Sequence, residues 1–228
     1  RYYQNNQTIN VTKAGYRANS SNHNISAEKN INETLTLSLS NGISNCQNIT
    51  EAGYYILTQN VSSDGTCFDI QEDNITLDCN GYWITYSLLG AADTNGIYAS
   101  RTNTTIQNCN IQDGNWTSPS NDRHGLDTYS GDYSTYTNNY VNVSNSYAFS
   151  IGGSGDYNNI KDNEFYSDTS NAISMSSTSN DNYVYNNTAH SVNKSAHGMM
   201  VNGKRHEITG NDAFGDIGLR IGTDNISI

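Results

Sequence analysis

The chain has 228 residues and a formal net charge of −11, with 11 Lys and Arg against 22 Asp and Glu. Proteins that bind nucleic acid need a basic stripe to neutralise phosphates, so this balance argues against a nucleic-acid partner. Strong helix formers are scarce, whereas Asn, Ser, Thr, Gly and 17 tyrosines dominate, which favours strands and turns.

No apolar run approaches the ~20 residues that a membrane-spanning helix requires, so we expect no membrane span. The sequence starts at Arg1 without a methionine, which we interpret as a processed mature chain or as a fragment that lacks its leader.

Residues 1–45 differ in pattern from the rest and are predicted to be an N-terminal extended arm with one strand. Residues 1–31 are polar and rich in Asn, with one short alternating piece at Ile9 and Val11. In TLTLSLS, residues 34–40, apolar and polar positions alternate strictly, which predicts a one-faced strand. It could be an ordinary first strand, or an inter-subunit strand that pairs with a neighbouring molecule. Its apolar residues are Leu35, Leu37 and Leu39.

Residues 46–228 carry a regular column of small residues, each followed at once by an apolar residue. The steps between its members are 29, 29, 23, 24, 26 and 20 residues. The small–apolar pair recurs while the number of residues between pairs varies, which indicates similar strands joined by loops of varying length. Separations of this size match the coils of a parallel β-solenoid. The small residues are Cys67, Gly96, Gly125, Ala148, Ala172, Gly198 and Gly218.

A second column repeats in the same region, with an apolar residue standing three positions before each member. Its members are Asn80, Cys109, Asn139, Asn163, Asn187 and Asn211, and from Asn139 the step is always 24 residues. Asn tolerates the left-handed backbone conformation, and stacked amides can hydrogen-bond at the ~4.8 Å strand spacing. The last four members therefore predict an inward Asn ladder at a corner of the solenoid.

The segments CQNITEAGYYILTQNV, TCFDI, DNITLDCNGYWI and NTTIQNCNI resemble right-handed parallel β-helix proteins of the pectin-lyase-like kind. The similarity is greatest to β-helix domains of archaeal and environmental surface proteins. It implies an all-β fold, a right-handed parallel β-helix of about seven coils over residues 46–228. At ~4.8 Å per coil, this would be a rod about 34 Å long.

The four cysteines fit this picture, because Cys46 and Cys67 would bracket one coil while Cys79 and Cys109 would lie near one corner of adjacent coils. We expect the disulfides Cys46–Cys67 and Cys79–Cys109, each worth ~3 kcal/mol by chain entropy. Free stacked thiols are the alternative. The absence of any C-x-x-C spacing argues against zinc binding.

Enzymes of the pectin-lyase-like kind use clustered carboxylates on one face of the helix. Here Asp122, His124 and Asp127 form the main candidate group for acid–base catalysis, and a second acidic group spans residues 69–78. The hydrolase pattern of that family is present only as the fragments DTNG and RHG. His124 and His197 would share a column but stand too far apart for one metal ion. We therefore expect no enzyme activity, no metal and no cofactor.

Asparagine is the strongest compositional signal, with 36 residues, 14 of which lie in N-x-S/T sequons. Turn-rich composition generates some sequons freely. The alternative, which we favour, is a secreted, N-glycosylated protein, in agreement with an even number of cysteines. The sequon residues are Asn6, Asn10, Asn19, Asn24, Asn32, Asn48, Asn60, Asn74, Asn103, Asn115, Asn142, Asn186, Asn193 and Asn225.

These features together predict a non-catalytic extracellular structural glycoprotein whose partners are copies of itself. The coil that begins at Gly218 has no polar cap after it, and an open solenoid end with a spare strand at the front suggests a surface layer or a head-to-tail filament. A truncated sequence would also lack a cap. The alternatives are a polysaccharide lyase or hydrolase, or a glycan-binding module that uses Trp83, Trp116 and the tyrosines.

Overall fold

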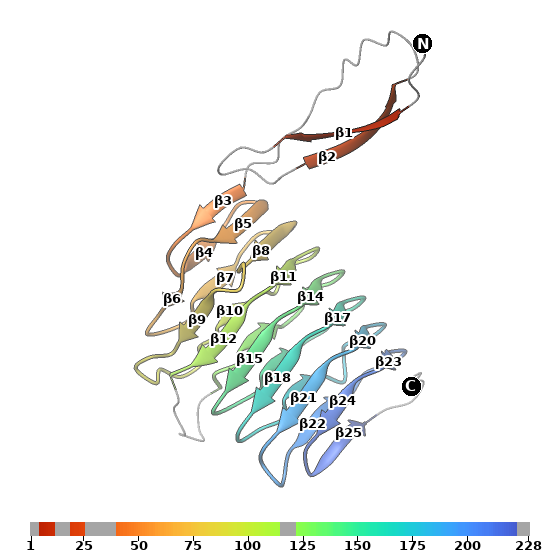
Figure 1. Cartoon of the computed structure of the whole chain (residues 1–228). Helices are drawn as coiled ribbons and strands as arrows, with labels where there is room; N and C mark the ends of the chain where they lie inside the picture. The colour runs from red at the N-terminus through yellow and green to blue at the C-terminus, as the bar shows by residue number, and fades with distance from the viewer. Residues whose placement is uncertain (1–4, 12–18, 26–39, 115–121, 223–228) are drawn as a thin grey trace.

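The computed structural model describes residues 5–11, 19–25, 40–114 and 122–222, with side chains from Asn41 onward. Three parallel sheets wrap around one core as a β-solenoid of about seven turns, and the strands of successive coils lie side by side along the stack (Figure 1). The described residues contain strands and turns and no helix. The predicted all-β solenoid is confirmed.

Each coil contributes one strand to each sheet. The first sheet contains β4 (Gln47–Ile49), β7 (Phe68–Ile70), β10 (Ile97–Tyr98), β13 (Leu126–Thr128), β16 (Phe149–Ile151), β19 (Ile173–Met175), β22 (His197–Val201) and β25 (Ile217–Ile221). The second contains β3 (Ser40–Ile43), β5 (Gly53–Leu57), β8 (Ile75–Asp78), β11 (Thr105–Gln107), β14 (Thr135–Thr137), β17 (Asn159–Lys161), β20 (Tyr183–Tyr185) and β23 (Glu207–Thr209). The third contains β6 (Val61–Ser62), β9 (Trp83–Tyr86), β12 (Asn110–Asp113), β15 (Tyr140–Val143), β18 (Glu164–Ser167), β21 (Thr188–Ser191) and β24 (Asp212–Phe214).

The N-terminal region contains an antiparallel pair of strands, β1 (Asn5–Val11) and β2 (Asn19–Ile25). This pairing was not predicted, because the polar sequence offers almost no alternating pattern. The solenoid ladder itself begins at β3, which pairs with β5, so it includes residues that precede 46. The predicted inter-subunit strand with Leu35, Leu37 and Leu39 lies outside the described residues.

The first predicted column is in register throughout the first sheet. Phe68 lies opposite Ile97, and Ile97 lies opposite Leu126; the alignment continues through Phe149 and Ile173. All five side chains are fully buried. Apolar side chains stacked on apolar side chains of the next coil bury a continuous face that a single coil could not bury alone.

The small residues are required where the chain turns from the third sheet into the first. A Cβ added to Gly125 would lie 2.2 Å from Val141 Cγ1 and 2.8 Å from the Ala148 carbonyl oxygen. At Gly96 a Cβ would lie 2.5 Å from both Ile111 Cγ2 and the Gly125 carbonyl. The corner backbone therefore packs directly against the core side chains of the third sheet, and larger residues are excluded.

An Asn ladder lines the corner between the second and third sheets, in the order Asn139, Asn163, Asn187 and Asn211. The Nδ2 of Asn163 donates to Asn187 Oδ1 at 2.9 Å, and its Oδ1 accepts from the backbone N–H and the Nδ2 of Asn139 at 2.9 and 3.0 Å. The next pair repeats this pattern. Each ladder residue follows a residue with left-handed φ, where the backbone leaves the sheet direction and the amide side chain of the next coil supplies the missing acceptor.

Asn80 does not belong to this column, contrary to the sequence spacing. It has a φ of 51° and is exposed, and Gly81 after it has a φ of 80°, so this coil contains a longer turn. The buried position is taken by Cys79, which forms a disulfide with Cys109. Both predicted disulfides are present, since Cys46 is also bonded to Cys67.

A second buried polar column, not predicted from the sequence, lines the corner between the first and second sheets. Ser134 N–H donates to Asn158 Oδ1 at 2.8 Å, Asn158 N–H to Asn182 Oδ1 at 2.7 Å, and Asn182 N–H to His206 Nδ1 at 3.1 Å. Each of these residues again follows one with left-handed φ. The column contains a hydroxyl, two amides and an imidazole, so only Asn158 and Asn182 share a residue type that could reveal it.

Candidate functional site

The main candidate catalytic group lies on and just before β13. Asp127 points outward from the first sheet, with Tyr98 and Ser150 opposite it on the two neighbouring strands. His124 lies at the corner before this strand, where its Nδ1 is 2.6 Å from Ser146 Oγ. Asp122 precedes them and is exposed. The structure therefore brings the three predicted residues into one neighbourhood.

Asp127 is the electrostatically unusual member of this group. Burial, the largest effect, raises the pKa of Asp127 above its ordinary value. The nearby His124 and a hydrogen bond from Ser150 act in the opposite direction, while the charge of Asp122 adds to the increase. The Oδ1 of Asp127 is buried and has no hydrogen-bond partner among the described residues. A partly buried carboxyl of this kind, with one oxygen shielded from solvent, holds its proton to a higher pH than an exposed one.

His124 and His197 lie in the same column of the solenoid but in coils that are not adjacent, as the sequence predicted. The ring of His124 stacks on Tyr147 with centroids 5.1 Å apart, and the N–H of His197 donates to Asn171 Oδ1 at 2.8 Å. Tyr147 and Asn171 thus stand between the two histidines. Among the described residues, no group of three or more His, Cys, Asp or Glu side chains is arranged to hold a metal ion.

The second acidic group, residues 69–78, is divided between faces. Asp69 lies on the first sheet and accepts from Gln71 Nε2 at 2.7 Å. Asp78 lies on the second sheet, where it accepts from the Tyr54 hydroxyl at 2.7 Å and from Gln107 Nε2 at 2.8 Å. Partial burial acts to raise the pKa of Asp78, but these and further hydrogen bonds lower it below its ordinary value overall. This carboxylate is a hydrogen-bond acceptor within the scaffold beside the Cys79–Cys109 disulfide.

Sequon asparagines lie on the surface wherever their side chains are described. Asn193 is half-buried and the other six are exposed: Asn48, Asn60, Asn74, Asn103, Asn142 and Asn186. The strands β1 and β2 carry Asn6, Asn10, Asn19 and Asn24, whose side chains are not described. Asn32, Asn115 and Asn225 lie outside the described residues.

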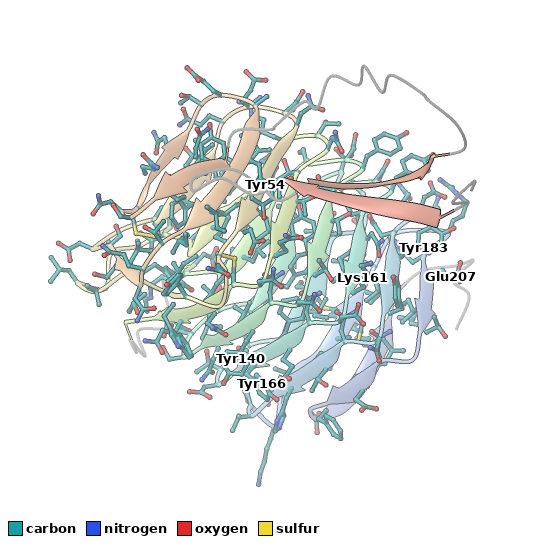
Figure 2. All side chains as sticks on the ribbon, turned by 45° about the horizontal axis from the view of Figure 1, so that its top comes forward. Tyr54, Tyr140, Lys161, Tyr166, Tyr183 and Glu207 are labelled. Carbon is teal, nitrogen blue, oxygen red and sulfur yellow. A yellow bond between two sulfur atoms is a disulfide. The ribbon has the colours of Figure 1, made fainter. Side chains whose placement is uncertain are left out.

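A continuous row of rings, here called the aromatic stripe, runs along the outer face of the third sheet. Its members are Trp83, Tyr140, Tyr166, His190 and Phe214. Successive ring centroids lie 5.9, 5.6, 5.9 and 5.8 Å apart. Tyr140 and Tyr166 lie side by side at this face in Figure 2. The stripe was not predicted, because its rings come from coils of unequal length and from two adjacent columns of the sheet.

The pKa of Asp127 gives a testable prediction about stability. Because the folded state raises this pKa, the free energy of unfolding should fall as pH rises from about 3.9, the ordinary Asp value, through the folded pKa. Asp127→Asn removes the partly buried charge and should raise the free energy of unfolding at pH 7 by about 1.4 kcal/mol for each unit of pKa elevation. Urea denaturation between pH 3 and pH 8 measures both effects.

Asp122→Asn is the comparison variant for this experiment. Asp122 is exposed and its charge is the smallest contribution to the Asp127 pKa, so its removal should raise stability far less than Asp127→Asn does. An Asp127→Asn protein that is no more stable than wild type at pH 7 would contradict the burial argument.

In the described part of the chain, no helix is long and apolar enough to cross a membrane. Comparison of the chain with protein-family models, curated proteins and solved structures gives no match. The fold therefore rests on the structure itself, and a relationship to pectin-lyase-like or archaeal surface proteins stays a prediction.

Proposed function

We propose that the chain is a non-catalytic structural glycoprotein of an extracellular surface, in which a stacked β-solenoid holds N-linked glycans on its outer faces. The observation that carries this proposal is that the described sequon asparagines lie at the surface, whereas the asparagines that are buried in the polar columns lie outside sequons. Asn186 and Asn187 illustrate it: the first belongs to a sequon and is exposed, while its neighbour belongs to the Asn ladder and is 2% exposed. None of the fully buried asparagines lies in a sequon.

The sequons are distributed over several faces of the solenoid. Asn48 is on the first sheet, Asn142 is on the third, and Asn186 is at the corner between the second and third. Glycans at these positions would surround the stack and keep its polar surface solvated. The two disulfides are compatible with an extracellular, oxidising location.

The absence of catalysis is proposed because the carboxylates with assigned partners serve the scaffold. Asp78 accepts hydrogen bonds from three strands or turns, and Asp73 Oδ1 accepts the backbone N–H of Thr102 at 2.9 Å in the next coil. Asp113 Oδ2 likewise accepts from the Ser144 hydroxyl at 2.7 Å. Such bonds join one coil to the next, which is the role expected of polar groups on a stacked solenoid.

Assembly with copies of the same chain is the second part of the proposal. It rests on the alternating pattern of residues 34–40, which is suited to adding a strand to another sheet. A contact of this kind is head-to-tail and extends into a filament or layer unless it closes into a ring.

Glycan occupancy tests the first part. In protein secreted from its natural source or from a eukaryotic host, peptide mass spectrometry should find glycans at the exposed sequons, including Asn48, Asn60 and Asn142. The reason is that their side chains are exposed in the folded protein, which can therefore accommodate an attached glycan. Unmodified asparagine at all seven surface sequons in naturally produced protein would overturn the proposal.

Truncation tests the second part. Removal of residues 1–39 keeps β3, the first strand of the second sheet, and should leave a folded monomer that no longer assembles. Light scattering and negative-stain imaging at rising concentration measure this, with the full chain as the reference. A full chain that stays monomeric at high concentration would refute the assembly.

A further inference from the structure

The aromatic stripe contains a sequon in its middle. Asn142 is exposed on β15, two residues after Tyr140, so both side chains point to the same outer face. On the next strand, the residue directly opposite Asn142 is Tyr166. The side-chain amide of Asn142 is therefore bordered by two rings whose centroids are 5.6 Å apart.

Two more sequons lie beside the same stripe. Asn60 Oδ1 accepts the backbone N–H of Trp83, the first ring of the stripe, at 3.0 Å, and Asn60 itself is exposed. At the other end, Asn193 lines a hollow of about 540 Å³ together with His190 and Phe214. The stripe is thus accompanied by a sequon at both ends and in the middle.

We propose that the aromatic stripe is the packing surface for this chain's own N-linked glycans, and that the first sugars of the glycan on Asn142 lie against Tyr166 and Tyr140. The inference rests on the proposed glycoprotein function and adds the site where the glycan is held. The C–H face of a pyranose ring is apolar, and an aromatic ring offers it a flat apolar surface with a polar edge. A tethered sugar also binds at high effective concentration, because the covalent bond has already restricted it to this face.

The surroundings of Asn142 favour the chain's own glycan over two other occupants of the stripe, a free polysaccharide and a second copy of the protein. A free polysaccharide lying along the stripe would collide with a glycan rooted between its rings. A second protein copy would need a flat apolar face, whereas Glu164 is exposed on the same strand as Tyr166, and its Oε2 accepts from the Tyr166 hydroxyl at 3.4 Å. Carboxylate and amide groups beside the rings suit sugar hydroxyls, which donate hydrogen bonds to them.

The sequon of Asn142 also fixes when the sugar must be added. Its hydroxyl residue, Ser144, is buried, and both its Oγ and its N–H bond to Asp113 Oδ2, at 2.7 and 3.0 Å. A transferase that reads N-x-S/T cannot reach this hydroxyl in the folded coil. The glycan must therefore be attached before β15 joins the sheet, and the experiment requires a host that glycosylates the chain during synthesis.

A double-mutant cycle in such a host tests the contact. The four proteins are the wild type, Asn142→Gln, Tyr166→Thr and the double variant, with occupancy of Asn142 checked by peptide mass spectrometry. If sugar and ring touch, Tyr166→Thr should lower the melting temperature more when the glycan is present, with a non-additivity of about 2–4 °C. The control cycle uses Asn48→Gln, because the residue opposite Asn48 is Asp69 rather than a ring, and it should be additive.

Proton NMR of the first sugar gives a readout that does not depend on stability. Ring currents should shift its C–H protons upfield at Asn142 relative to Asn48, and the shift should shrink in Tyr166→Thr, which leaves only Tyr140 beside the sugar. An occupied Asn142 with an additive cycle and no upfield shift would overturn the inference and leave the glycoprotein proposal standing.

Two further outcomes also decide the question. Asn142 bare while other sequons are occupied would overturn this inference alone, and all sequons bare would overturn the proposed function with it. Binding of a cello-oligosaccharide probe to the wild-type glycoprotein, lost in Tyr166→Thr, would assign the stripe to a free polysaccharide instead.

Discussion

The structure depends on how the backbone turns its corners without leaving buried N–H groups unpaired. At two of the three corners a residue with left-handed φ takes the chain out of one sheet, and the next N–H points along the stack rather than into a strand ladder. A side-chain acceptor from the following coil pairs with it, as Asn163 Oδ1 does for the Asn139 N–H. An unpaired buried amide costs ~1–3 kcal/mol, so the loss of any one acceptor should lower the free energy of unfolding measurably.

The same hydrogen bonds set the register of the three sheets. A slip by one residue would move every inward side chain to the outer face. The ladders resist this because each amide bonds to both neighbouring coils, as Asn163 does to Asn187 Oδ1 and to the Tyr136 carbonyl. The fixed 24-residue coils between Asn139 and Asn211 are the region where this constraint repeats without interruption. Once the register is fixed, the outer faces are fixed as well. The glycosylation sites and the rings of the aromatic stripe therefore occupy defined neighbouring positions.

Much of the solenoid could be predicted from the sequence, because most inward columns repeat one kind of side chain, either apolar or amide. Phe68, Ile97 and Leu126 reveal their column because each is apolar and follows a small residue, and the four asparagines reveal theirs by identity. The disulfide pairing followed from the same register. Where a column mixes chemistries, as at Ser134, Asn158 and His206, the residue types hide a spacing that is as regular as that of the Asn ladder.

The outer faces were harder to predict for a physical reason. Many residue types are tolerated at solvent-exposed positions, so an outer column need not repeat one kind of side chain. Between Trp83 and Tyr140, for example, the intervening coil places Asn110 in the same column. The turn at Asn80 and Gly81 is two residues longer than the matching turn of the next coil, so the regular spacing wrongly placed Asn80 in the ladder. The burial of Asp127 depends on neighbours from adjacent strands, which no local pattern records.

Amide hydrogen exchange tests the corner constraint most directly. The N–H groups of Asn139, Asn163 and Asn187 should exchange as slowly as those of the core strands, and far more slowly than the exposed turn residue Ser177. In Asn163→Ala, protection should fall at Asn139, whose N–H loses its acceptor, more than at Asn187. Corner amides that exchange as fast as Ser177 in the wild-type protein would contradict the account.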